Sequence, residues 1–188
     1  MHLPGLTYRG APLDDLELLE RLPAELQQLL ALRNGFVAYR GAIHLRGASR
    51  TPAWHALRTV CEGPAALHRS LALLDPGDVP FGQDALGRQF VLREEKTFRL
   101  DPLALTLDAL GLDLTAFLQE LYEQPQRLLP LEVLLQFETA GATLRPGQIL
   151  LASSHSPHHP PQYRAVPAED FLASLGSVSA GTLRSERP

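Results

Sequence analysis

Three histidines, His155, His158 and His159, lie within five residues of one another and could act as metal ligands. Imidazole is the commonest neutral metal ligand, so a zinc or nickel site is one interpretation. The flanking Ser156-Pro157 and Pro160-Pro161 pairs instead indicate a stiff, solvated loop, and no cysteine lies nearby to complete a tetrahedral set. Adjacent histidines also rarely point at the same ion. We expect an exposed loop, with no metal and no other cofactor.

The pattern Gly82-x-Asp84-x-x-Gly87 superficially resembles a dinucleotide-binding fingerprint. In that fingerprint a glycine stands where the backbone approaches the pyrophosphate, whereas here a carboxylate would repel it. The residues that follow predict a strand, so the helix N-terminus that binds the anion is missing as well. The pattern therefore favours a tight turn over a nucleotide site.

The remaining candidates for catalysis are equally weak. Glu94 and Glu95 are adjacent in a predicted strand end and would point to opposite faces, so they cannot share a reacting atom. Cys61 lacks the sequence context of a nucleophile, and Ser153-Ser154-His155 has no Gly-x-Ser-x-Gly elbow. Trp54, the single tryptophan, is typical of a core or core-edge residue. We expect no catalytic residues and no enzyme activity.

Length, charge and cysteine content limit the class of protein further. The chain has 188 residues, enough for one domain with a sizeable core, and a formal net charge of -4. This charge argues against nucleic-acid binding, which needs a basic stripe. One cysteine permits no internal disulfide, and the sequence shows neither a signal peptide nor an apolar run that could span a bilayer. We expect a cytoplasmic protein that does not bind a membrane.

The charges are unevenly distributed along the chain. Residues 26 to 61 hold five arginines and no acid, and residues 100 to 126 hold five acids and no base. Within the acidic segment, we predict partner-binding roles for Asp101, Asp108, Glu120 and Glu123. The alternative interpretation is that these acids are the solvated faces of a linker and a helix.

Periodicity predicts helices and short strands in alternation. Two helices are expected over 12–33, divided by Pro23 and stopped by Asn34-Gly35. Leu114, Phe117, Leu118, Leu121 and Tyr122 form a helical apolar face that begins after Asp113, a good N-cap. Further helical segments are expected over 54–60, 65–74 and 130–137 and after Pro167, and strands over 36–39, 43–45, 98–100, 105–107, 148–151 and 163–166.

The tract from Pro80 to Leu92 predicts two strands joined by a turn. Asp84 and Gly87 occupy the first and fourth positions that a type I turn favours, and the alternation around Phe90 and Leu92 predicts a half-buried strand.

Two blocks of the sequence resemble those of the SUKH superfamily. Leu22-Pro23-Ala24-Glu25-Leu26 followed by Arg33-Asn34-Gly35-Phe36 is similar to its first block, and Phe81-Gly82-x-Asp84-x-x-Gly87-x-x-Phe90 is similar to its second. The resemblance runs in the same order over roughly residues 10 to 175. It implies an α+β fold, mainly an antiparallel sheet with helices packed around it, and a binding role, most often as a bacterial immunity protein.

The expected organisation is an N-terminal arm over 1–9, a SUKH-like domain over 10–175 and a flexible tail over 176–188. The expected function is a non-catalytic antitoxin that occludes the active site of a cognate protein toxin, for which a basic nuclease would suit the acidic segment. The alternative is an adaptor or scaffold protein of a bacterial secretion or regulatory complex. A metal-dependent hydrolase that uses His155, His158 and His159 is the least favoured hypothesis.

Overall fold

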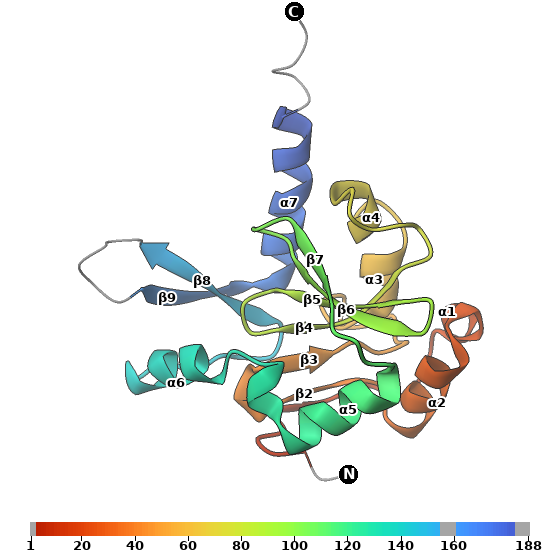
Figure 1. Cartoon of the computed structure of the whole chain (residues 1–188), viewed down its shortest axis with the longest axis horizontal. Helices are drawn as coiled ribbons and strands as arrows, with labels where there is room; N and C mark the ends of the chain where they lie inside the picture. The colour runs from red at the N-terminus through yellow and green to blue at the C-terminus, as the bar shows by residue number, and fades with distance from the viewer. Residues whose placement is uncertain (1–2, 155–160, 183–188) are drawn as a thin grey trace, which may run out of the picture.

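Seven short strands that follow one another along the chain form an antiparallel sheet in the computed structural model, which describes residues 3–154 and 161–182 (Figure 1). Each strand pairs with the one before it, so the spatial order is β1-β2-β3-β4-β5-β6-β7. The strands are β1 (Tyr8–Arg9), β2 (Phe36–Ala38), β3 (Ile43–Leu45), β4 (Val79–Asp84), β5 (Gln89–Arg93), β6 (Lys96–Asp101) and β7 (Thr106–Ala109). With the helices around it, this sheet gives the α+β domain that the sequence predicts.

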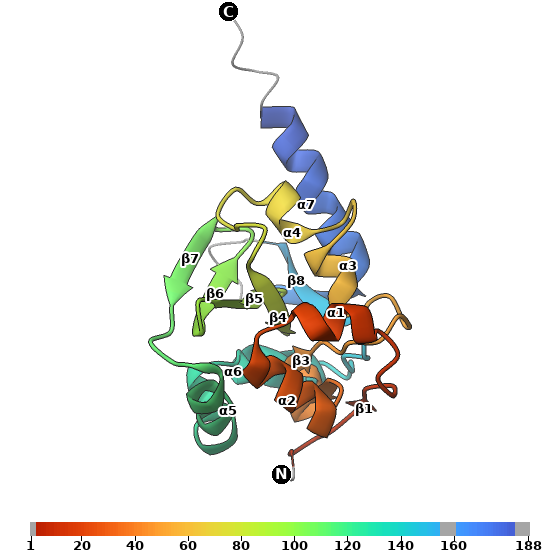
Figure 2. The same ribbon diagram turned by 90° about the vertical axis from the view of Figure 1, so that its right-hand side faces the viewer.

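The helices lie around the sheet (Figures 1 and 2). They are α1 (Leu16–Arg21), α2 (Ala24–Leu32), α3 (Leu57–Cys61), α4 (Leu67–Ser70), α5 (Leu114–Glu123), α6 (Leu131–Thr139) and α7 (Ala168–Thr182), with 3-10 turns η1 (Tyr39–Gly41) and η2 (Pro125–Arg127). None of the helices within the described residues has the length and apolar character needed to cross a bilayer.

The predicted turn between β4 and β5 is confirmed. The Gly87 N–H donates to the Asp84 carbonyl at 3.0 Å, and Gly87 has a φ of 77°. Asp84 Oδ1 accepts from the N–H groups of Leu86 and Arg88 at 2.9 and 3.1 Å, and Oδ2 accepts from Arg88 Nε at 2.6 Å. The aspartate therefore organises the turn through the local hydrogen bonds that this residue type favours.

Strand β5 is buried on both faces, and the prediction of a half-buried strand is wrong. Gln89, Phe90, Val91 and Leu92 are all buried. Phe90 packs against Phe117 of α5 with ring centroids 4.9 Å apart, and the neighbouring residues point to the opposite face. That face is also covered, so the alternation of residue types does not correspond to an alternation of solvent and core.

Glu94 and Glu95 form the two-residue turn between β5 and β6, not the predicted strand end. Both have positive φ, 48° and 64°, and Arg93 pairs with Lys96. Such a turn matches the twist of the flanking strands, although asparagine and glycine adopt it more readily.

Helix α5 begins where the sequence predicts. Asp113 Oδ1 accepts from the Ala116 N–H at 2.8 Å, which caps the helix. Leu114, Phe117 and Leu121 are buried against the sheet, but Tyr122, expected on the same apolar face, is 52% exposed.

Asp15 joins two helices that are distant in sequence. Its carboxylate accepts from Leu18 N at the start of α1 and from Arg58 of α3, with Nε to Oδ2 at 2.6 Å and Nη2 to Oδ1 at 2.7 Å. This bidentate bond with Arg58 lowers the pKa of the buried Asp15 carboxyl.

Both ends of the described chain differ from the predicted organisation. Leu3 is buried and β1 pairs with β2, so part of the predicted N-terminal arm belongs to the sheet. Strands β8 (Gln148–Ser154) and β9 (Gln162–Pro167) form a separate antiparallel ribbon. Helix α7 follows and continues to Thr182, so residues 176–182 are helical where a flexible tail was expected.

Candidate functional site

The first two predicted partner-binding residues flank the β6–β7 hairpin. Asp101 ends β6, and its Oδ1 accepts from the N–H groups of Leu103 and Ala104 at 3.0 and 2.9 Å. It therefore shapes the turn. Asp108 is exposed on β7, one of the two outer strands of the sheet, directly opposite Arg99 of β6.

The other two lie on α5 and differ in their surroundings. Glu120 has a side chain only 16% exposed, and its Oε1 lies 2.7 Å from Arg127 Nη1. Glu120 is therefore already paired within the chain, and its partner-binding role stays a prediction. Glu123 is exposed and accepts from Gln119 Nε2 at 3.0 Å. Of the four acids, Asp108 and Glu123 are the two that are exposed and that take part in no ion pair within the described residues.

A buried cation lies at the end of β3, at a position that sequence reasoning did not single out. Arg46 is 2% exposed, and its guanidinium donates to the Pro80 carbonyl at 2.9 Å and to Gln83 Oε1 and Gln89 Oε1 at 2.7 and 2.8 Å. Gln89 Nε2 in turn donates to the Gly87 carbonyl at 2.6 Å. Three neutral oxygens from β4 and β5 thus solvate the charge.

No carboxylate in the described part of the chain forms an ion pair with Arg46. Burial lowers the pKa of Arg46 to about 10, so the group remains protonated at neutral pH. A buried charge is tolerated only when its hydrogen bonds are made, and here they tie the end of β3 to β4 and β5. These hydrogen bonds therefore give Arg46 a structural role.

His44 and His55 form a second buried polar group beside Arg46. His44 Nε2 lies 2.9 Å from His55 Nδ1, and His55 Nε2 lies 3.1 Å from the Asn34 carbonyl. A carbonyl only accepts, so His55 Nε2 carries a proton and its Nδ1 accepts from His44 Nε2–H. His44 Nδ1 is then a bare acceptor, and it has no hydrogen-bond partner among the described residues.

Two glycines make room for the His55 ring. A Cβ added at Gly35 would lie 2.4 Å from His55 Cε1, and one added at Gly47 would lie 2.7 Å from His55 Nε2. Aromatic contacts complete the group, since Trp54 packs 5.1 Å from His44 and 4.8 Å from Tyr8 between ring centroids. Partly buried Trp54 therefore lies at the core edge, as the sequence predicts.

Because both histidines are buried, we expect the free energy of unfolding to depend on pH. Burial lowers the pKa of His55 to about 4 and holds the pKa of His44 well below its ordinary value of 6.5, and the Arg46 charge adds to both effects. Between pH 6.5 and about 4 the unfolded chain binds more protons than the folded one, so the free energy of unfolding falls as the pH falls. Each histidine contributes up to about 1.4 kcal/mol per pH unit in this window.

Urea unfolding at a series of pH values between 7 and 4 checks this expectation. His44→Gln should lower the pH dependence by about one proton. Gln28→Ala, which alters an exposed residue of α2 without a titratable side chain, should leave it unchanged. Equal pH dependence in all three proteins would show that the buried histidines do not titrate as inferred.

The other candidates for chemistry gain no support from their surroundings. Burial raises the pKa of the Cys61 thiol to about 12, which keeps it protonated and a poor nucleophile. Within residues 3–154 and 161–182, no three histidine, cysteine, aspartate or glutamate side chains are grouped so as to hold a metal ion. His155, His158 and His159 lie outside the described residues.

The sequence carried a faint signal for the buried cluster. Arg46 follows the predicted strand 43–45, and two glutamines flank the β4–β5 turn, a pattern that also fits ordinary solvated positions. Their convergence depends on strand register, because Leu45 pairs with Gly82 and Gln83 with Gln89.

Comparison with known proteins finds one similarity, which is in the fold. No protein-family model and no curated protein matches this sequence. Among solved structures, the chain is similar to Atu4351 from Agrobacterium tumefaciens, with a TM-score of 0.63 and 15% sequence identity. The match covers 93% of this chain and 84% of that one. At this identity the likeness shows a shared α+β fold.

Proposed function

We propose that this protein is a non-catalytic, cytoplasmic immunity protein that binds a cognate toxin and covers its active site. The observation that carries the proposal is the exposure of two unpaired acids of the acidic segment. Folding leaves Asp108 exposed on the outer strand β7 and Glu123 exposed on α5, with no ion pair to either carboxylate among the described residues. The resemblance to the SUKH superfamily supports the same class of function.

The β6–β7 hairpin, which carries Asp108, also exposes apolar side chains that could contact a partner. Leu103 and Leu105, between β6 and β7, are 67% and 62% exposed. Outermost strands offer unpaired backbone groups to another chain, and exposed apolar side chains add to such contacts. A basic partner such as a nuclease would meet both the acids and the apolar hairpin.

Charge reversal tests the proposal. The partner for the assay is any toxin that a search of the neighbouring genes identifies, and the variant is Asp108→Lys with Glu123→Lys. Because complementary charge mainly accelerates association, we expect association about tenfold slower at low salt, with a weaker salt dependence and reduced inhibition of the toxin. Glu120 is left unchanged, since its pairing with Arg127 would confound the result.

The matched control reverses two exposed acids elsewhere, Glu20→Lys with Glu132→Lys, for the same change in net charge. If both variants bind alike, the acidic segment is only a solvated face. Stable binding that leaves the toxin active would favour the adaptor function, and absence of any complex with the toxin would contradict the proposal.

A further inference from the structure

Residues 26 to 61, the arginine-rich segment, have most of their positive charges paired or buried in the folded chain. Arg40 pairs with Glu138 at 3.2 Å, Arg50 with Asp15 at 3.5 Å and Arg58 with Asp15 at 2.6 Å. Arg46 is buried among neutral acceptors. Arg33 is thus the member of this segment that has neither an ion pair nor a buried site within the described residues.

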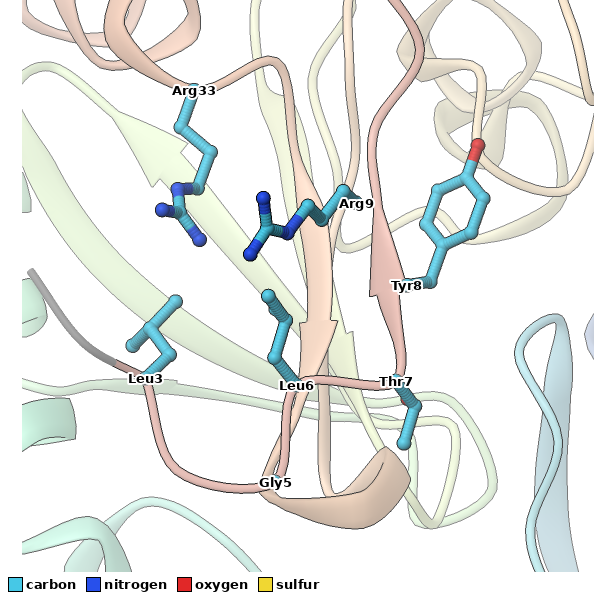
Figure 3. A pocket seen from close by; sticks show the side chains of 7 residues that line it. All are labelled: Leu3, Gly5, Leu6, Thr7, Tyr8, Arg9 and Arg33. Carbon is cyan, nitrogen blue, oxygen red and sulfur yellow. The ribbon is translucent and has the colours of Figure 1, made fainter.

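The fold brings a second arginine to Arg33. Arg9 of β1 and Arg33, which follows α2, line one open hollow of about 740 Å³ together with Leu3, Gly5, Leu6, Thr7 and Tyr8 (Figure 3). No acidic residue lines it, and Arg9 has no ion pair in the described part of the chain either. Two like charges that share a hollow repel each other, so an anion placed between them is favoured.

The two arginines also line a neighbouring hollow that has apolar residues in its wall. A second hollow of about 400 Å³ is lined by the same Arg9 and Arg33 and by Leu13, Leu30 and Leu32. Leu32 is 89% exposed, so its side chain is accessible to a partner. Both hollows lie along β1, an outermost strand of the sheet.

We propose that these two adjacent hollows, which share Arg9 and Arg33 and are together called the β1 groove, bind an extended segment of the protein partner that carries an acidic side chain flanked by apolar residues. The two guanidinium groups suit a carboxylate, the exposed leucine suits an apolar neighbour, and an outermost strand suits an extended backbone. This inference rests on the proposed protein-binding function and names a second contact, remote in sequence from the acidic segment.

The size and lining of the groove favour an acidic peptide over a free phosphate or a nucleic-acid backbone. A free phosphate would occupy a small part of its volume and leave the apolar region empty. A nucleic-acid backbone needs a longer row of cations than two arginines provide, on a chain whose net charge is -4. An acidic peptide segment uses both the charged and the apolar parts.

Selection from a displayed library of random peptides, about twelve residues long, tests the inference without any toxin. We expect the selected peptides to carry Asp or Glu beside apolar residues and to bind Arg9→Gln/Arg33→Gln at least about tenfold more weakly. Arg69→Gln/Arg164→Gln, which removes two exposed arginines elsewhere, is the control and should bind as the parent does. Replacing the acid of a selected peptide with its amide should cost a similar factor.

Three outcomes would overturn the inference. Selection could yield no peptides, or peptides that bind the Arg9→Gln/Arg33→Gln variant as well as the parent. Inorganic phosphate that binds at Arg9 and Arg33 as tightly as the selected peptides, measured by competition, would instead assign the groove to free anions. Because no toxin is present, these results are independent of the test of immunity.

Discussion

Replacing Gly87 with valine should lower the free energy of unfolding by about 3 kcal/mol or more. Two effects add at this position. A φ of 77° is strained for any residue with a Cβ and most strained for a β-branched one. The new Cβ would also lie 2.8 Å from Ile149 Cδ1 and 2.8 Å from Phe171 Cε1, closer than real contacts allow.

Gly111→Val separates these two effects. Gly111 has a similar φ of 73°, but no atom lies within 4 Å of the position its Cβ would take. This variant should show the strain alone, about 1 to 2 kcal/mol. Chemical denaturation of both variants measures the difference. Equal losses would mean that the turn moves away from Phe171 at no cost.

Replacing Arg46 with alanine should destabilise the protein by about 4 kcal/mol. The substitution leaves the Pro80 carbonyl, Gln83 Oε1 and Gln89 Oε1 buried without the donor that they share, and it opens a cavity. Arg164→Ala, at an exposed position on β9, should change stability by less than about 0.5 kcal/mol and serves as the control.

A triple substitution tests the cause. Arg46→Met with Gln83→Leu and Gln89→Leu removes the donor and its two side-chain acceptors together, and replacing both partners costs less than orphaning one. We expect it to recover at least about half of the stability lost in Arg46→Ala. A triple variant no more stable than Arg46→Ala would show that neither the two side-chain oxygens nor the cavity dominates the loss, and would point to the Pro80 and Gly87 carbonyls, which lose their donors in the triple variant.

Features governed by neighbours in sequence could be predicted. The turn at Asp84 and Gly87 and the cap at Asp113 are made by hydrogen bonds that span two to four residues, so residue type and spacing suffice. The helices on either side of Pro23 and most of the strands follow from periodicity for the same reason. The acidic segment was visible as well, although the sequence could not show that Glu120 is paired while Asp108 and Glu123 are not.

The sequence by itself thus determined the α+β class, the main turn and the uneven charge. Only the tertiary structure decided that β5 is covered on both faces, that Arg46 is buried, that β1 and Leu3 join the domain, and that Arg9 lies beside Arg33. Each of these depends on contacts between residues far apart in the chain, such as Arg46 with Gln83 and Gln89. Such contacts are fixed by strand register and packing, because burial and charge pairing depend on every element that approaches a residue, whereas periodicity reports on one element alone.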